Sequence, residues 1–420
     1  MSQQIIRRTG KWMRGVWRVS CFSWMVLLFG LFGWAQAASI QTPQIPIQLE
    51  KKLSSLLGPQ DAAVVAAPDG RILASIHGDK LLTPASTLKV LTALAALRHL
   101  GADYRYPTDI FHSPKGDLII KGYGDPLLLS ENLDAIARQL AGQIKEVGAL
   151  VLDDSYFAYP IDIPGRKRSF EPYDAPNGAL CVNFNTVYFK KENGHWASAE
   201  PQTPLLPSII PKIEASGLTT GRMTLAADRD ESLRYTGELF GHFLNKAGIL
   251  VKGPIVLGSL ENGEDQLLEH YLSPQRLTDV IANLMAFSNN FIANQLMLTM
   301  GAQVGGAPAT VDKGVKVLQH FYHEILGIQT GQIVEGSGLS RGNQVSARTM
   351  LLLLEKFAPY ANLLRHNGRQ WYKTGTLKDV HTRVGYLESV NGDYYRFVVM
   401  LNTPGKTTDR VMKALERELK

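Results

Sequence analysis

Ser86 and Lys89 are the first residues whose types and spacing predict chemistry. They enclose the motif Ser86-Thr87-Leu88-Lys89 at the start of a helix that Pro84 is expected to open. One helical turn separates the two side chains, so both lie on the same face near the helix N-terminus. A serine hydroxyl becomes a good nucleophile when a base takes its proton, and a lysine of depressed pKa can be that base. The alternative is a capping serine beside a solvated lysine.

A second candidate motif, Lys373-Thr374-Gly375, lies near the end of the chain and is followed by Thr376. It falls on a predicted strand. The glycine would let a substrate backbone lie against the strand edge, and the lysine and threonine would supply a charge and a hydroxyl for an anionic group. The alternative is a solvated lysine beside a flexible glycine.

The third pattern, Ser-x-Asn, occurs three times, beginning at Ser130, Ser288 and Ser389. Ser130 is explained as the N-cap of a following helix, and Ser389 falls at a hairpin tip. Ser288 and Asn290 lie where one predicted helix (277–287) passes into the next (291–300). Such a junction can direct side chains into a cleft, so we favour this copy.

The elements that must position these motifs predict an α+β protein. Strands are expected at 62–66 and 71–76, around the turn residues 68–70, and helices follow position 274 as far as about 357. Further strands are expected at 371–374, 383–390 and 395–401, and a last helix runs from about 409.

The middle of the chain has a different pattern of expected secondary structure. Strands are expected at 118–120, 149–152 and 180–189, with a helix near 133–147 and a proline-rich passage at 201–211. We therefore predict one catalytic domain in two parts, 38–106 and 266–420, with an inserted domain at 107–265.

The first 37 residues have the pattern of a signal peptide. Five basic residues precede an uncharged apolar run at 19–34, and Ala35-Gln36-Ala37 provides the small-x-small cleavage pattern. The alternative is an uncleaved anchor to the inner membrane. The whole chain of 420 residues has a formal charge of +6; without the leader's basic residues about +1 is left, so charge gives no reason to expect nucleic acid. Cleavage would leave Cys181 alone, without a disulfide or a thiolate cluster.

Ser-x-x-Lys, Ser-x-Asn and Lys-Thr-Gly stand in the order typical of penicillin-recognising serine acyl transferases. The chain resembles the low-molecular-mass class C penicillin-binding proteins, the D-alanyl-D-alanine carboxypeptidase/endopeptidase group. The resemblance covers nearly all of the chain after the leader, including 124–126, 175–185 and 336–341. Asn289 and Glu335 stand where the family more usually has aspartate. The insertion is short for the group, so a nested third domain is expected to be reduced or missing.

The resemblance implies a β-lactamase/transpeptidase-like fold, with an antiparallel sheet flanked by helices and a smaller α/β domain inserted. It also implies catalytic roles. Ser86 attacks the carbonyl between two D-alanines, and Lys89 accepts its proton. Ser288 passes a proton to the leaving amine, and Lys89, Asn290 and Lys373 hold the Ser288 side chain in place.

Binding roles follow from the same resemblance. Thr374 and Thr376, with Gly375 between them, bind the terminal carboxylate, and the backbone N–H groups of Ser86 and Thr376 form the oxyanion hole. Asp125 and Arg341 match positions at which the family binds the free end of a diaminopimelate side chain, whose ammonium and carboxylate call for one partner of each sign. The alternative is an aspartate that fixes a turn and a surface arginine.

The resemblance therefore implies an exported, periplasmic serine-type D-Ala-D-Ala carboxypeptidase, with endopeptidase activity as a further option. It would act on peptidoglycan stem peptides and be inhibited by β-lactams, without cofactor or metal. Two alternatives stay open: a β-lactamase or esterase of the same fold, and an inactive peptidoglycan-binding protein. His320 and His323 lack the His-Glu-x-x-His spacing of a zinc enzyme.

Overall fold

The computed structural model describes residues 44–225, 228–259 and 264–419. The predicted leader, with Cys21, lies outside the described residues. Within them, no helix is both long and apolar enough to cross a bilayer.

The helices are α1 (Gln44–Leu56), α2 (Lys89–His99), α3 (Ser130–Leu140), α4 (Ile210–Ser216), α5 (Arg229–Lys246), α6 (Leu277–Phe287), α7 (Asn290–Gly305), α8 (Val311–His320), α9 (Ala347–Phe357) and α10 (Asp409–Glu418). The strands are β1 (Asp61–Ala66), β2 (Ile72–Ile76), β3 (Leu81–Leu82), β4 (Pro107–His112), β5 (Leu118–Gly122), β6 (Glu146–Val147), β7 (Leu150–Asp153), β8 (Thr186–Glu192), β9 (His195–Ser198), β10 (Thr220–Thr224), β11 (Leu250–Val251), β12 (Ile255–Leu257), β13 (Gln266–Leu272), β14 (Val345–Ser346), β15 (Arg365–Asn367), β16 (Gln370–Leu377), β17 (Val380–Glu388) and β18 (Tyr394–Leu401).

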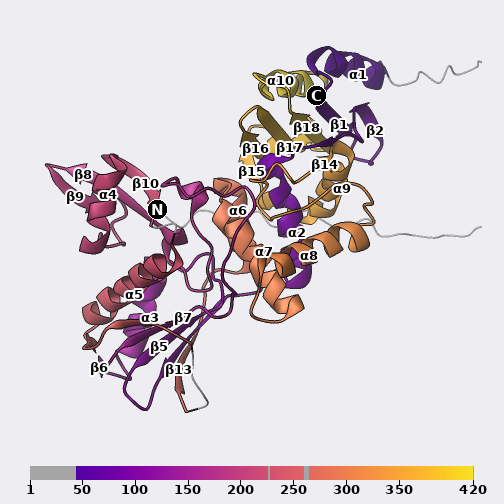
Figure 1. Cartoon of the computed structure of the whole chain (residues 1–420). Coiled ribbons are helices and arrows are strands. Elements are labelled where there is room, and N and C mark those ends of the chain that lie inside the picture. Colours follow the sequence, from indigo (N-terminus) through magenta and orange to yellow (C-terminus); the bar gives the residue numbers. More distant parts are fainter. Residues whose placement is uncertain (1–43, 226–227, 260–263, 420) are drawn as a thin grey trace, which may run out of the picture. The chain divides into compact units, whose positions relative to one another are not determined.

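A six-stranded antiparallel sheet joins the two ends of the described chain. Its order is β15-β16-β17-β18-β1-β2, so β1 lies between the last strand of the chain and its own hairpin partner. Successive side chains of a strand point to opposite faces. Val64 accordingly packs among the helices that include α2 and α9, whereas Ala63 and Val65 pack against α1 and α10. Figure 1 shows α1 and α10 side by side on their face of the sheet.

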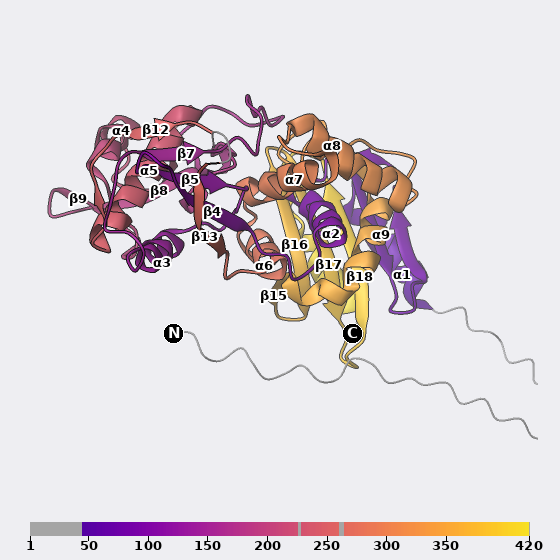
Figure 2. The ribbon, with the colours of Figure 1, turned by 90° about the horizontal axis from the view of Figure 1, so that it is seen from below.

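Helix α2 is buried on nearly all sides. The described residues from Lys89 to Leu97 are all buried, among α6, α7, α8 and α9 (Figure 2). A helix apolar around its whole circumference belongs in a core. Lys89 therefore lies inside the domain, where an unpaired charge would be very costly.

The segment between β4 and β13 forms sheets and a core of its own. A five-stranded sheet runs β12-β7-β5-β4-β13, with β12, β7 and β5 parallel and the other pairs antiparallel. Helices α3 and α5 supply Ile136 and Phe240 to its hydrophobic core. A separate antiparallel sheet, β10-β8-β9, continues this segment. Strand β13 pairs with β4, so the segment's sheet extends past the expected boundary at 265 to Leu272.

Two of the expected elements in this segment are present with different bounds. The helix expected near 133–147 is α3, which ends at Leu140, and 146–147 form strand β6. The strand expected at 180–189 begins only at Thr186. Before it, Asn183 and Asn185 have left-handed φ values of 51° and 53°. Asparagine tolerates this conformation, which cannot continue a strand. The early strands, the opening helix, the late helices and the C-terminal strands are confirmed.

Candidate active site

Ser86 lies on a fixed turn that leads into α2. The turn is a 3₁₀ segment, Ala85–Leu88, and Ala85 has a left-handed φ of 48°. A non-glycine residue in that region is held there by its surroundings. Thr87 and Thr382 both donate to the carbonyl of Pro84, at 2.6 and 2.7 Å. The turn thus places a half-buried Ser86 at the N-terminal end of the helix.

Two glycines make room for this turn. A Cβ on Gly338 would lie 1.9 Å from the carbonyl oxygen of Ala85, and a Cβ on Gly375 would lie 2.8 Å from the Ser86 nitrogen. Real Cβ atoms do not approach so closely, so both positions require glycine. Gly375 therefore faces the serine turn, and its lack of a side chain is required by the packing against that turn. The other expected role of Gly375, to let a substrate backbone lie against the strand edge, stays a prediction.

Lys89 is held by three oxygen atoms. Its Nζ lies 2.9 Å from Ser86 Oγ and donates to Asn290 Oδ1 at 2.8 Å and to the Ser337 carbonyl at 2.7 Å. The last two atoms can only accept. When Lys89 is neutral, its two N–H groups are used there and its lone pair faces the Ser86 hydroxyl. Burial, and then the charge of Lys373, lower the pKa of Lys89 well below its usual value.

Lys373 and Ser288 form the second half of the site. Ser288 connects α6 to α7 with a left-handed φ of 55°, and Lys373 Nζ donates to its Oγ at 2.7 Å and to the Thr374 carbonyl at 2.6 Å. Burial, and then the charge of Arg365, lower the pKa of Lys373 to about 7.

One edge of β16 is open beside the serine. On one side β16 pairs with β17 along its length, from Gln370 to Leu377. On the other side, within the described chain, β15 reaches only 370–372. Thr374 and Thr376 are exposed, whereas Lys373 and Gly375 are buried. A peptide can add to such an edge as an extra strand.

Asp125 and Arg341 have different surroundings. Asp125 is only 4% exposed, accepts from the Leu127 N–H at 2.8 Å, and has its pKa raised to about 6 by burial. Arg341 is exposed and donates to the Lys378 carbonyl. No hydrogen bond or ion pair joins the two in the described part of the chain. The structure does not bring this pair together, and its shared role in binding stays a prediction.

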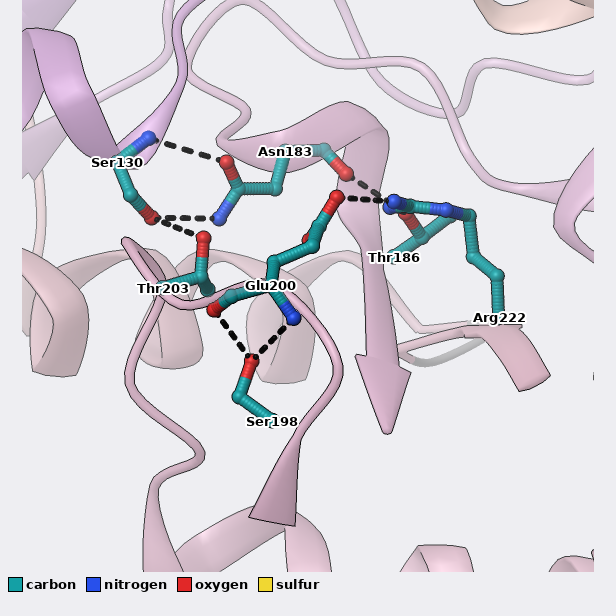
Figure 3. Close-up of polar contacts among 7 residues, drawn as sticks. All are labelled: Ser130, Asn183, Thr186, Ser198, Glu200, Thr203 and Arg222. Atoms are coloured by element: carbon teal, nitrogen blue, oxygen red, sulfur yellow. Dashed lines mark hydrogen bonds and ion pairs between the residues drawn. The ribbon is translucent and has the colours of Figure 1, made fainter. Parts of the chain in front are cut away.

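The serines of the two other Ser-x-Asn copies form hydrogen bonds that stabilise local structure. Ser130 is fully buried; it exchanges hydrogen bonds with Asn183 and accepts one from Thr203 (Figure 3). It is the first residue of α3 rather than its N-cap, which is Leu129. Ser389 accepts from two backbone N–H groups at the β17–β18 hairpin.

Sequence reasoning missed two residues that complete the site. The Ser337 carbonyl holds Lys89, and the buried Glu335 carboxylate holds the Ser337 loop. The glycine-rich run 336–338 marks a close backbone approach, but its partner lies some 250 positions earlier in the chain.

The site can be compared with known proteins. The sequence profile described as the D-Ala-D-Ala carboxypeptidase 3 (S13) family matches residues 48–228 and 219–367. The chain belongs to this family. A curated relative, "D-alanyl-D-alanine carboxypeptidase" of Actinomadura sp. (strain R39), is 31% identical over 350 residues, which are 71% of this chain and 64% of the relative. The chain thus spans just under two thirds of that relative's length.

Two solved structures have a fold similar to that of this chain. The crystal structure of penicillin binding protein 4 (dacB) from Haemophilus influenzae superposes with a TM-score of 0.70 at 22% identity, over 89% of this chain and 98% of that one. The same protein complexed with a β-lactam superposes with a TM-score of 0.64, also at 22% identity, over the same shares of the two chains. At this identity the likeness establishes the expected β-lactamase/transpeptidase-like α+β fold.

Proposed function

We propose that this family member is a serine-type D-Ala-D-Ala carboxypeptidase that acts on peptidoglycan stem peptides through an acyl-enzyme on Ser86. The observation that carries the proposal is the position of Lys89, fully buried and bonded to Ser86, Asn290 and the Ser337 carbonyl. A buried lysine with its lone pair directed at a serine hydroxyl is suited to be a general base.

In the acylation step the Ser86 proton moves to Lys89 Nζ as Ser86 Oγ bonds to the substrate carbonyl carbon. The N–H groups of Ser86 and Thr376 are proposed to receive the developing oxyanion. The C–N bond to the last D-alanine then breaks, and the Ser288 hydroxyl gives its proton to the leaving nitrogen. Lys373 donates to Ser288 Oγ and so stabilises that oxygen as its proton leaves. The proton on Lys89 restores the Ser288 hydroxyl.

Hydrolysis reverses these roles. A water attacks the ester carbonyl while Lys89 takes its proton, and the Ser86 oxygen recovers a proton as it leaves. Thr374 and Thr376, exposed on the open edge of β16, are proposed to bind the substrate's terminal carboxylate, and Gly375 to offer its backbone.

We also propose the domain plan and location that this function needs. The inserted domain runs from 107 to 272, because β13 belongs to its sheet. The leader pattern at 1–37 supports export to the periplasm. N-terminal sequencing of the protein from cells would find Ala38 first if the leader is cleaved, and Met1 or Ser2 if it is retained as an anchor.

Digestion of purified peptidoglycan tests the proposed activity. We expect the protein to release free D-alanine from pentapeptide stems, as seen by mass spectrometry of the soluble products. Splitting of cross-linked dimers would show endopeptidase activity of the same site. Both products should disappear when the enzyme is first treated with penicillin. Rapid hydrolysis of the β-lactam with no release from peptidoglycan would instead identify a β-lactamase, and binding without any product would identify an inactive module.

Arg341 is expected to affect substrate choice rather than chemistry. The predicted contact of Arg341 with the charged end of the stem peptide is remote from the scissile bond. Its loss in Arg341→Ala should cost about 1.5–3 kcal/mol, roughly a ten- to hundredfold lower kcat/KM, on a stem peptide with a free diaminopimelate end. A simple acyl-D-Ala-D-Ala peptide should be hydrolysed nearly as before.

Asp125→Ala tests the other half of the predicted pocket. The same selective loss would support a role for Asp125 in binding. Equal losses on both substrates, together with a lower melting temperature, would identify Asp125, which is only 4% exposed, as a buried structural carboxylate. Equal losses in Arg341→Ala would contradict the pocket altogether.

A further inference from the structure

Glu335 is a fully buried carboxylate that is satisfied by neutral donors. Within the described chain no lysine, arginine or histidine forms an ion pair with it. It accepts hydrogen bonds from the Ser337 N–H (2.7 Å), the Ser337 hydroxyl (2.6 Å), the Gly338 N–H (2.7 Å), the Ser340 N–H (3.3 Å) and the Asn343 amide (2.6 Å). A buried charge is expensive unless it is fully hydrogen-bonded. A carboxylate kept under these conditions fixes the whole loop from 336 to 343.

One peptide unit connects Glu335 to Lys89. The Gly338 N–H that donates to Glu335 and the Ser337 carbonyl that accepts from Lys89 belong to the same peptide group, between residues 337 and 338. Hydrogen bonds in series polarise one another. The carboxylate therefore increases the negative charge on the carbonyl oxygen that holds the Lys89 amine, and it fixes the orientation of that peptide plane.

The same loop lies directly against the nucleophile. Gly338 has a φ of 80° and approaches Ala85 so closely that a Cβ would overlap its carbonyl oxygen. The neighbouring Gly336 is held by α2 and α7, since Thr92 donates to its carbonyl and its N–H donates to Asn294. A change in the loop would thus move the Ser337 carbonyl relative to both Lys89 and Ser86.

We propose that Glu335 is a positioning residue for acylation: through the 337–338 peptide group it aims and polarises the carbonyl that directs the lone pair of Lys89 at Ser86. The proposal rests on the proposed function, because it concerns the base that activates Ser86. Glu335 itself contacts neither the serine nor the substrate.

The charges around Lys89 give this role a signature in pH. Lys89 is influenced by Lys373 on β16, which lowers its pKa, and by Glu335, whose negative charge opposes that lowering. Its direct partners from the other elements, Ser86, Asn290 and the Ser337 carbonyl, carry no charge. Removing the charge of Glu335 should therefore lower the pKa of Lys89 further, in addition to misplacing its acceptor.

The test is the rate of acylation by a fluorescent penicillin as a function of pH, with thermal unfolding measured in parallel. In Glu335→Gln the maximal rate should fall roughly ten- to a hundredfold, as expected for a misplaced catalytic group, and the rising limb of the profile should move to lower pH. Glu335→Asp keeps the negative charge and introduces aspartate, which is the more usual residue at this position in the family. It should keep the position of the rising limb and most of the rate.

Three outcomes would overturn the proposal. One is a folded Glu335→Gln protein with the parent's rising limb, since a merely structural residue would change stability without moving it. Another is Glu335→Asp behaving like Glu335→Gln. If Glu335→Gln does not fold, Ser337→Ala provides the test. It removes the hydroxyl that donates to Glu335, so the negative charge of the carboxylate is less compensated and the rising limb should move to higher pH. A rising limb that does not move in Ser337→Ala is the third contradicting outcome. Failure of the unmodified protein to be acylated would count against the proposed function instead.

Discussion

Replacing Ser86 by alanine is expected to abolish covalent labelling by penicillin and to lower kcat for D-alanine release by roughly 10⁴-fold or more. Removal of the nucleophile leaves no atom to form the acyl-enzyme. The hydrogen bonds of Lys89 to Asn290 and the Ser337 carbonyl, and of Lys373 to Ser288, do not involve Ser86 and should persist. Ser86 is half-buried and small, so the fold should survive. Gel fluorescence after incubation with labelled penicillin measures the first effect, and quantitation of released D-alanine measures the second.

The matched control is Ser389→Ala, which removes a hydroxyl from the β17–β18 hairpin. It should label and turn over as the parent does. Undiminished labelling of Ser86→Ala in a correctly folded protein would show that another residue is the nucleophile.

Replacing Lys89 by methionine is expected to lower the acylation rate by about 10²–10⁴-fold, the usual contribution of a positioned base. Methionine fills a similar volume but cannot take the serine proton. In the parent, kcat/KM should rise with pH as Lys89 loses its proton, because the pKa of Lys89 in the free enzyme is depressed by burial and by Lys373. It should fall again as Lys373, with a pKa of about 7, loses the charge with which it donates to Ser288 Oγ. In Lys89→Met the rising limb should be absent.

Lys356→Met, an exposed change of the same kind on α9, provides the control and should preserve both limbs. Acylation rates by stopped-flow mixing over a range of pH measure the effect. A Lys89→Met protein that keeps the parent's rising limb would assign that limb, and the base, to another group.

The local parts of the site could be predicted from the sequence. Ser86 and Lys89 meet because they are one helical turn apart, a relation that is set by backbone geometry alone. Thr374 and Thr376 share a face because side chains alternate along a strand. The pairing of β17 with β18 was also predictable, because the hairpin tip near Ser389 separates two expected strands. The antiparallel sheet as a whole was implied only by the family resemblance.

The rest depended on contacts between distant positions. The Ser337 carbonyl reaches Lys89 across 248 positions, and a backbone carbonyl has no signature in the sequence. Glu335 looked like an ordinary replacement for aspartate, because its five donors become visible only when the loop is folded. In the inserted segment, the left-handed residues Asn183 and Asn185 shortened an expected strand, and β13 joined the sheet from beyond the expected boundary. Apolar patterning does not report either effect.

The most direct test is to locate the acyl group after brief exposure of the purified protein to penicillin. Peptide mass spectrometry should find a single adduct, of the mass of one intact penicillin, on the peptide that contains Ser86, and fragmentation should place it on that side chain. An adduct on Ser288, Ser130 or Ser337, or a protein that stays unmodified while its fold is intact, would contradict an acyl-enzyme on Ser86.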